Sequence, residues 1–106
     1  MPKYLVQASY TTEGLKGLLK DSGSSRKAHI DQLIKNMGGA LESFHYTFGD
    51  KDVCAIVEMP DHASMTALSL AIGATGMVQI KTTVLLSPED IDTAVKMSVA
   101  YRPPGL

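Results

Sequence analysis

The sequence contains no tryptophan, a single cysteine and no long hydrophobic run. Because Cys54 has no partner in the chain, an internal disulfide is excluded, and a reducing compartment, the cytoplasm, is expected. No apolar run approaches the roughly 20 residues of a membrane span, and no basic-then-apolar leader follows Met1. A net charge of −1 and only four tyrosines and two phenylalanines argue against nucleic acid or a membrane as partner.

Clustered metal ligands are also missing. The three histidines, His29, His45 and His62, are far apart in the sequence and are expected on different elements. No Cys/His spacing typical of a metal site occurs, and no cofactor motif is present. The sequence therefore predicts neither a metal nor a cofactor.

The residues that are present predict one α+β domain over residues 1–106, with an extended tail over 98–106 because Pro103 and Pro104 cannot continue a helix. Alternating apolar residues predict strands over 3–10, 41–48, 52–59 and 77–86. Helical spacing predicts a helix capped by Thr11 or Thr12 and interrupted at 22–25, where Ser24 or Ser25 caps its second piece. Asp61 and Ser87 are the predicted caps of two later helices.

The resulting order, βαββαβ followed by a terminal helix, is the ferredoxin-like pattern. Its antiparallel four-stranded sheet has the order 4-1-3-2, with both main helices on one face. The predicted helix-facing residues are apolar: Tyr4, Val6, Ala8, Phe44, Tyr46, Phe48, Val53, Ala55, Val57, Val78, Ile80 and Val84.

The opposite sheet face is mixed, and no helix remains to cover it. Leu5, Ile56 and Leu85 on this face are too apolar to face water comfortably. A second subunit that places its own sheet there would cover them, so we expect a homodimer, or a higher multiple of it, built as a dimeric α+β barrel. The alternative is a solvated sheet face, which antiparallel sheets allow.

The mixed face also carries the candidate chemistry. His45 on the second strand lies beside Cys54 or Glu58 on the third, depending on the hairpin register. In an antiparallel hairpin the numbers of two paired residues have a constant sum, which defines the register. A sum of 99 (His45 opposite Cys54) and a sum of 101 (Ser43 opposite Glu58) both keep the apolar residues on one face. A Cys–His pair is a nucleophile-and-base arrangement, and Glu58 could orient the histidine. The alternative is a histidine that is simply hydrogen bonded within a subunit interface.

Gln7 and Lys81 are predicted on the same face, on the first and fourth strands. With His45, Cys54 and Glu58 they could line a polar cavity that binds a small carbonyl or carboxylate compound, with His45 as the candidate acid or base. The competing function is a non-catalytic oligomerisation domain, in which these residues are only interface contacts.

Several segments together resemble the GYD-domain family: "EGLKGLL", "GG" before the second strand, "FHYTFGDKDVCAIVEMPD", "ALSLAIGATGMV", "TTVLLSPEDID" and "SVAYRPPG". The resemblance spans essentially the whole chain and implies a ferredoxin-like fold of the dimeric α+β barrel group, without an assigned activity. One position departs from the family pattern. Gly49 and Asp52 match its Gly-Tyr-Asp signature, but Lys51 stands where the tyrosine would be, so no role of a tyrosine hydroxyl carries over.

Overall fold

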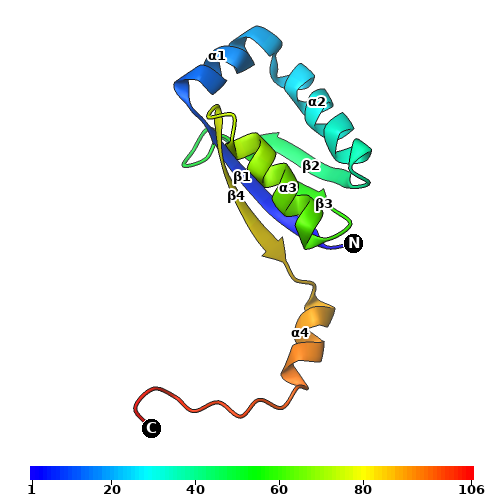
Figure 1. Cartoon of the computed structure of the whole chain (residues 1–106), viewed down its shortest axis with the longest axis vertical. Helices are drawn as coiled ribbons and strands as arrows, with labels where there is room; N and C mark the ends of the chain where they lie inside the picture. The colour runs from blue at the N-terminus through cyan, green and yellow to red at the C-terminus, as the bar shows by residue number, and fades with distance from the viewer.

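The computed structural model describes residues 1–106 and contains four strands and four helices (Figure 1). In chain order the elements are β1 Lys3–Tyr10, α1 Thr12–Asp21, α2 Gly23–Asn36, β2 Ala40–Tyr46, β3 Val53–Glu58, α3 His62–Gly73, β4 Val78–Leu85 and α4 Pro88–Val95.

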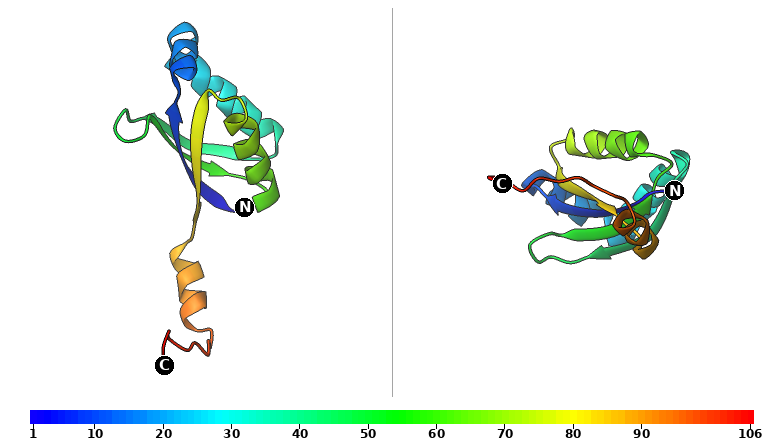
Figure 2. Two further views of the ribbon diagram at one scale, coloured as in Figure 1. Left: turned by 60° about the vertical axis from the view of Figure 1, so that its left-hand side comes forward. Right: turned by 90° about the horizontal axis from the view of Figure 1, so that it is seen from below.

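The four strands form one antiparallel sheet in the order β2-β3-β1-β4. Read from the other edge this is 4-1-3-2, so the predicted α+β, ferredoxin-like fold is confirmed. Helices α2 and α3 cover one face of the sheet (Figures 1 and 2). The other face carries no helix, and we call it the open face. None of the helices is long and apolar enough to cross a membrane.

The core lies between these two helices and the central strands. Alternate residues of β1 and β3 are buried beneath α2 and α3, as the apolar alternation predicts. Tyr4, Ile34, Met59 and Met65 are the largest side chains with almost no exposure. Only 11 of the 106 residues are buried, so much apolar surface stays uncovered within one chain.

Two of the residues expected under the helices are exposed. Phe48 is 57% exposed because β2 ends at Tyr46 and Phe48 lies in the turn at a φ of 47°, where its ring stacks on Tyr46. Val84 is 49% exposed because β4 is an edge strand and no element lies beyond it. The prediction was therefore wrong for Phe48, whereas Val84 lies on the predicted face, paired with the buried Tyr4, but is not buried there.

The break between α1 and α2 is shorter than the predicted interruption at 22–25, because only Ser22 separates the two helices. Ser22, at a φ of 82°, ends α1, and its side chain accepts a hydrogen bond from the Ser25 amide at the start of α2. Ser24 and Ser25 lie in the first turn of α2, so the cap is Ser22 rather than either of them.

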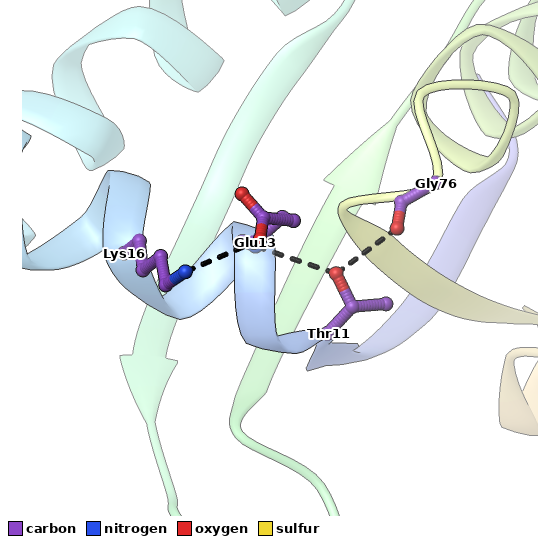
Figure 3. A network of polar contacts seen from close by, with 5 residues as sticks. Thr11, Glu13, Lys16 and Gly76 are labelled. Carbon is purple, nitrogen blue, oxygen red and sulfur yellow. Dashed lines mark hydrogen bonds and ion pairs between the residues drawn. The ribbon is translucent and has the colours of Figure 1, made fainter.

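Thr11 joins the start of α1 to the turn before β4 (Figure 3). Its hydroxyl donates to the carbonyl oxygens of Gly76, at 2.9 Å, and Met77, at 3.2 Å, and it accepts the Gly14 amide as the cap of α1. Lys16 and Glu13 pair on the exposed side of the same helix at 3.4 Å. The contacts of Thr11 hold the start of α1 against the turn before β4.

Asp61 caps α3 as predicted, since its Oδ1 accepts the Ser64 amide at 2.7 Å and the Ser64 hydroxyl at 2.6 Å. These hydrogen bonds from Ser64 lower the pKa of Asp61 below its ordinary value.

The lowered pKa leads to a testable pH dependence. A carboxyl whose folded-state pKa is depressed stabilises the fold above its unfolded pKa, and this stabilisation is lost as pH falls through the folded pKa. We expect the Tm of the wild type to fall more between pH 6 and pH 3 than that of Asp61→Asn, which keeps a capping oxygen without the charge. Circular dichroism melts measure this, and parallel pH profiles would contradict it.

Helix α4 has the predicted start: Ser87 and Asp90 form a reciprocal capping box and Pro88 opens the helix. Beyond the end of β4, residues 86–106 project away from the sheet and the other helices (Figures 1 and 2), and we call this segment the arm. Every residue from Pro88 to Leu106 is exposed.

Candidate functional site

Four of the five predicted site residues form one straight line across the open face of the sheet, and we call these four residues the row. His45 on β2 pairs with Cys54 on β3, Cys54 pairs with Gln7 on β1, and Gln7 pairs with Lys81 on β4. Residues that pair directly in a ladder point to the same face. Because neighbouring strands lie roughly 4.8 Å apart, the row spans roughly 14 Å of sheet.

The register of the β2–β3 hairpin produces this row. The observed pairing sum is 99 from Ser43 to Tyr46, so His45 lies opposite Cys54 and the alternative with Ser43 opposite Glu58 is excluded. The register shifts by one between Leu41 and Ser43, and beyond this bulge Ala40 pairs with Glu58. A bulge of this kind allows the strand to bend without moving His45 from its row.

Glu58 is not part of the row. It lies four residues along β3 from Cys54, a separation of roughly 13 Å in a strand. Its Oε1 lies 3.6 Å from the Lys3 Nζ, which also binds Glu42 at 3.1 Å. The two carboxylates raise the pKa of Lys3, Glu42 more than Glu58. In one chain Glu58 therefore belongs to a surface ion-pair cluster and does not orient His45.

Between the row and this cluster lies an apolar band. Leu5 pairs with Ile56, which pairs with Ser43, and Leu5 also pairs with Thr83. Leu5 and Ile56 are half-buried although no helix covers them. The open face thus has a polar row and an apolar band side by side.

In a single chain the row faces solvent. His45 and Lys81 are exposed, and Gln7 and Cys54 are half-buried by their neighbours. The space between α2, α3 and the sheet is a different environment: a cavity of ≈ 70 Å³ lined by 14 hydrophobic residues and Arg26. This cavity is therefore apolar apart from Arg26, and the polar residues predicted to form a site are gathered on the opposite face.

The row combines groups that suit an anionic or carbonyl-bearing molecule. The Lys81 ammonium attracts a carboxylate, and the Gln7 amide both donates and accepts hydrogen bonds. The His45 imidazole can donate or accept a hydrogen bond, and the Cys54 side chain lies next to it on β3. No group of three or more His, Cys, Asp and Glu side chains is arranged to hold a metal ion.

Sequence reasoning did not find the pair formed by Tyr4 and His62. The buried Tyr4 hydroxyl lies 2.5 Å from His62 Nδ1 at the start of α3, and the two rings meet edge to face. Burial raises the pKa of Tyr4, with a smaller contribution from the Asp61 carboxylate. The signal available was the position of His62 next to the helix cap, but nothing in the pattern shows that Tyr4 reaches it.

Asp52, at the end of the turn between β2 and β3, connects this hairpin to the central strand β1. Its Oδ2 accepts the Tyr10 amide and its own amide donates to the Ala8 carbonyl, both at 2.8 Å. Lys51 beside it is half-buried. The turn residues thus fix the end of β1 that lies just beyond Gln7 of the row.

The sheet order, the two covering helices and the open opposite face define the chain as a ferredoxin-like α+β protein. The model of the GYD domain matches residues 4–95, and the chain belongs to this family. Searches of curated proteins and of solved structures found no match. The match includes α4, so the terminal helix is part of the family domain.

Proposed function

We propose that the chain forms a homodimer, or a higher multiple of it, in which the open faces of two sheets enclose a partly polar cavity that binds a small organic acid or carbonyl compound. The observation that carries the proposal is the row of His45, Cys54, Gln7 and Lys81 on the face that has no helix. Closure of this face as a dimeric α+β barrel would desolvate the row and strengthen its electrostatic contacts.

Within this cavity Lys81 is proposed to hold the anionic or carbonyl oxygen and Gln7 to orient it by hydrogen bonding. His45 is the proposed acid or base if the bound molecule is also transformed. Cys54 lies between His45 and Gln7, so it is proposed to contact the same ligand. Glu58, next to Lys3, is proposed to line the rim. The cytoplasmic location remains a prediction from the unpaired Cys54.

A non-catalytic oligomerisation domain is the second candidate. The observation that favours it is the apolar band around Leu5 and Ile56, together with the half-buried Leu85 on the same face. If these side chains of two copies fill the space between the sheets, the row becomes an interface contact and no ligand enters.

A thermal-shift screen of small carboxylates and carbonyl compounds separates the two candidates. We expect at least one compound at about 100 times its Kd to raise the wild-type Tm by about 5 °C or more. The shift should be lost in Lys81→Ala and reduced in His45→Ala, because each removes a group that contacts the ligand. Lys27→Ala, which removes an exposed lysine from α2 on the helix side, is the matched control and should keep the full shift.

Shifts that persist unchanged in both row variants would remove the row from the binding site. If no compound of either class shifts the wild type, the oligomerisation domain is favoured instead.

A further inference from the structure

The arm, residues 86–106, carries large apolar side chains that its own chain does not bury. Val95 is 75% exposed and Val99 78% exposed, and four other large apolar residues of the arm are exposed between 48% and 71%: Leu86, Ile91, Met97 and Tyr101. Single exposed apolar residues are normal on a protein surface, but a contiguous set marks an interaction site.

The area exposed by the whole chain is too large for a compact monomer. Its accessible surface is 7218 Å², whereas a folded monomer of 11.3 kDa exposes roughly 5,700 Å². The excess, roughly 1,500 Å², is about twice the roughly 800 Å² that each partner contributes to a standard interface. The radius of gyration of 17.1 Å likewise exceeds the roughly 13 Å of a compact domain of this length.

The sequence of the arm does not suit a membrane as the covering partner. The first turns of α4 carry Glu89, Asp90 and Asp92, and only Lys96 and Arg102 are basic in the whole arm. Helices that bind membrane surfaces carry lysine and arginine on the polar face, because the cytoplasmic leaflet is anionic. A protein surface is the partner that fits an apolar arm of this charge.

Position favours a second copy of the same chain. The arm begins directly after Leu85, which lies on the open sheet face opposite Lys3. A second copy stacked on that face therefore has its own sheet beside the base of the arm. Near that base a groove runs between α4 and the body of the domain, and its lining includes Leu85 of the open face as well as His62 and Val84 of the helix-covered face. The base of the arm and the open face thus adjoin at Leu85.

We infer that residues 86–101 of each copy pack on the second copy, so that two arms clasp the dimer reciprocally. In a two-fold dimer the contact is made twice, once by each arm, with the same residues on both sides. The inference rests on the dimer of the proposed function but does not need its cavity to bind a ligand.

Removing the apolar side chains of the arm tests the inference in the full-length protein. Ile91→Ser, Val95→Ser and Met97→Ser combined should raise the dimer dissociation constant by about tenfold or more, measured by sedimentation velocity. The matched control combines Glu89→Ser, Asp92→Ser and Lys96→Ser, which changes three polar residues of the same segment and should leave the constant within about threefold. Equal dissociation constants for the two triple variants would overturn the inference.

A photocrosslinking experiment locates the arm directly. Full-length protein with the photocrosslinker benzoylphenylalanine in place of Val95 is prepared in ¹⁴N- and ¹⁵N-labelled form. The two preparations are mixed, irradiated and digested. The inference predicts peptides that join one isotope to the other. Crosslinks confined to one isotope, or none at all, would overturn it, while the cavity of the proposed function would still be tested by the ligand screen.

Discussion

Gly14→Ala is expected to destabilise the fold by about 3 kcal/mol, a large fraction of the roughly 5–15 kcal/mol that holds a domain together. A methyl group at Gly14 would lie 2.0 Å from the Met77 carbonyl oxygen and 3.1 Å from the Tyr10 ring. The carbonyl cannot move away freely, because it accepts the Thr11 amide at 2.9 Å and the Thr11 hydroxyl at 3.2 Å. Relief of the clash therefore breaks the junction between α1 and β4.

The same helix supplies the control. Gly17 has nothing within 4 Å of an added methyl group, so Gly17→Ala should stabilise the fold by about 0.5–1 kcal/mol through helix propensity. Urea unfolding followed by circular dichroism measures both variants. Similar stabilities for Gly14→Ala and Gly17→Ala would show that the close approach at Met77 is not a constraint.

Ile56→Lys is expected to convert the oligomer into monomers, raising the dissociation constant by about a hundredfold or more. Ile56 lies at the centre of the apolar band on the open face, next to Leu5. Closure of that face would bury an unpaired ammonium from each copy, which costs several kcal/mol. In the separate chain the lysine stem can lie along the sheet with its amine in water, so the monomer should still fold.

Leu70→Lys is the matched control, because Leu70 is 67% exposed on α3, on the helix side. It makes the same change of an apolar residue to lysine and should leave the oligomer intact. If both variants keep the wild-type mass, the open face is not the interface.

The central part of the fold could be predicted from the sequence because period-two alternation fixes the two faces of β1 and β3. The caps at Thr11, Asp61 and Ser87 were predictable for a related reason, since short polar side chains accept the free amides of a helix start. These signals are local, and tertiary contacts do not override them here.

The site was predictable only up to the hairpin register. Alternation allows sums of 99 and 101, and only the structure shows that His45 lies opposite Cys54. This register places His45 opposite Cys54, four residues along β3 from Glu58, and Glu58 pairs with Lys3 instead. Contacts of this kind depend on cross-strand pairing, which one sequence does not encode locally.

Three other features were beyond sequence reasoning for physical reasons. Phe48 has the parity of a buried strand residue, but the strand ends before it. Tyr4 reaches His62 across a separation of 58 residues. Ile91 and Val95 of α4 are exposed, and only the structure shows that their own chain does not bury them.

The mass of the wild-type protein in solution tests the central claim most directly, because every proposal above needs a second copy on the open sheet face. Light scattering at micromolar concentration should give twice the chain mass of 11.3 kDa, or a higher multiple of that dimer. A mass equal to that of one chain would contradict the account, since the row, the apolar band and the arm would then all face solvent.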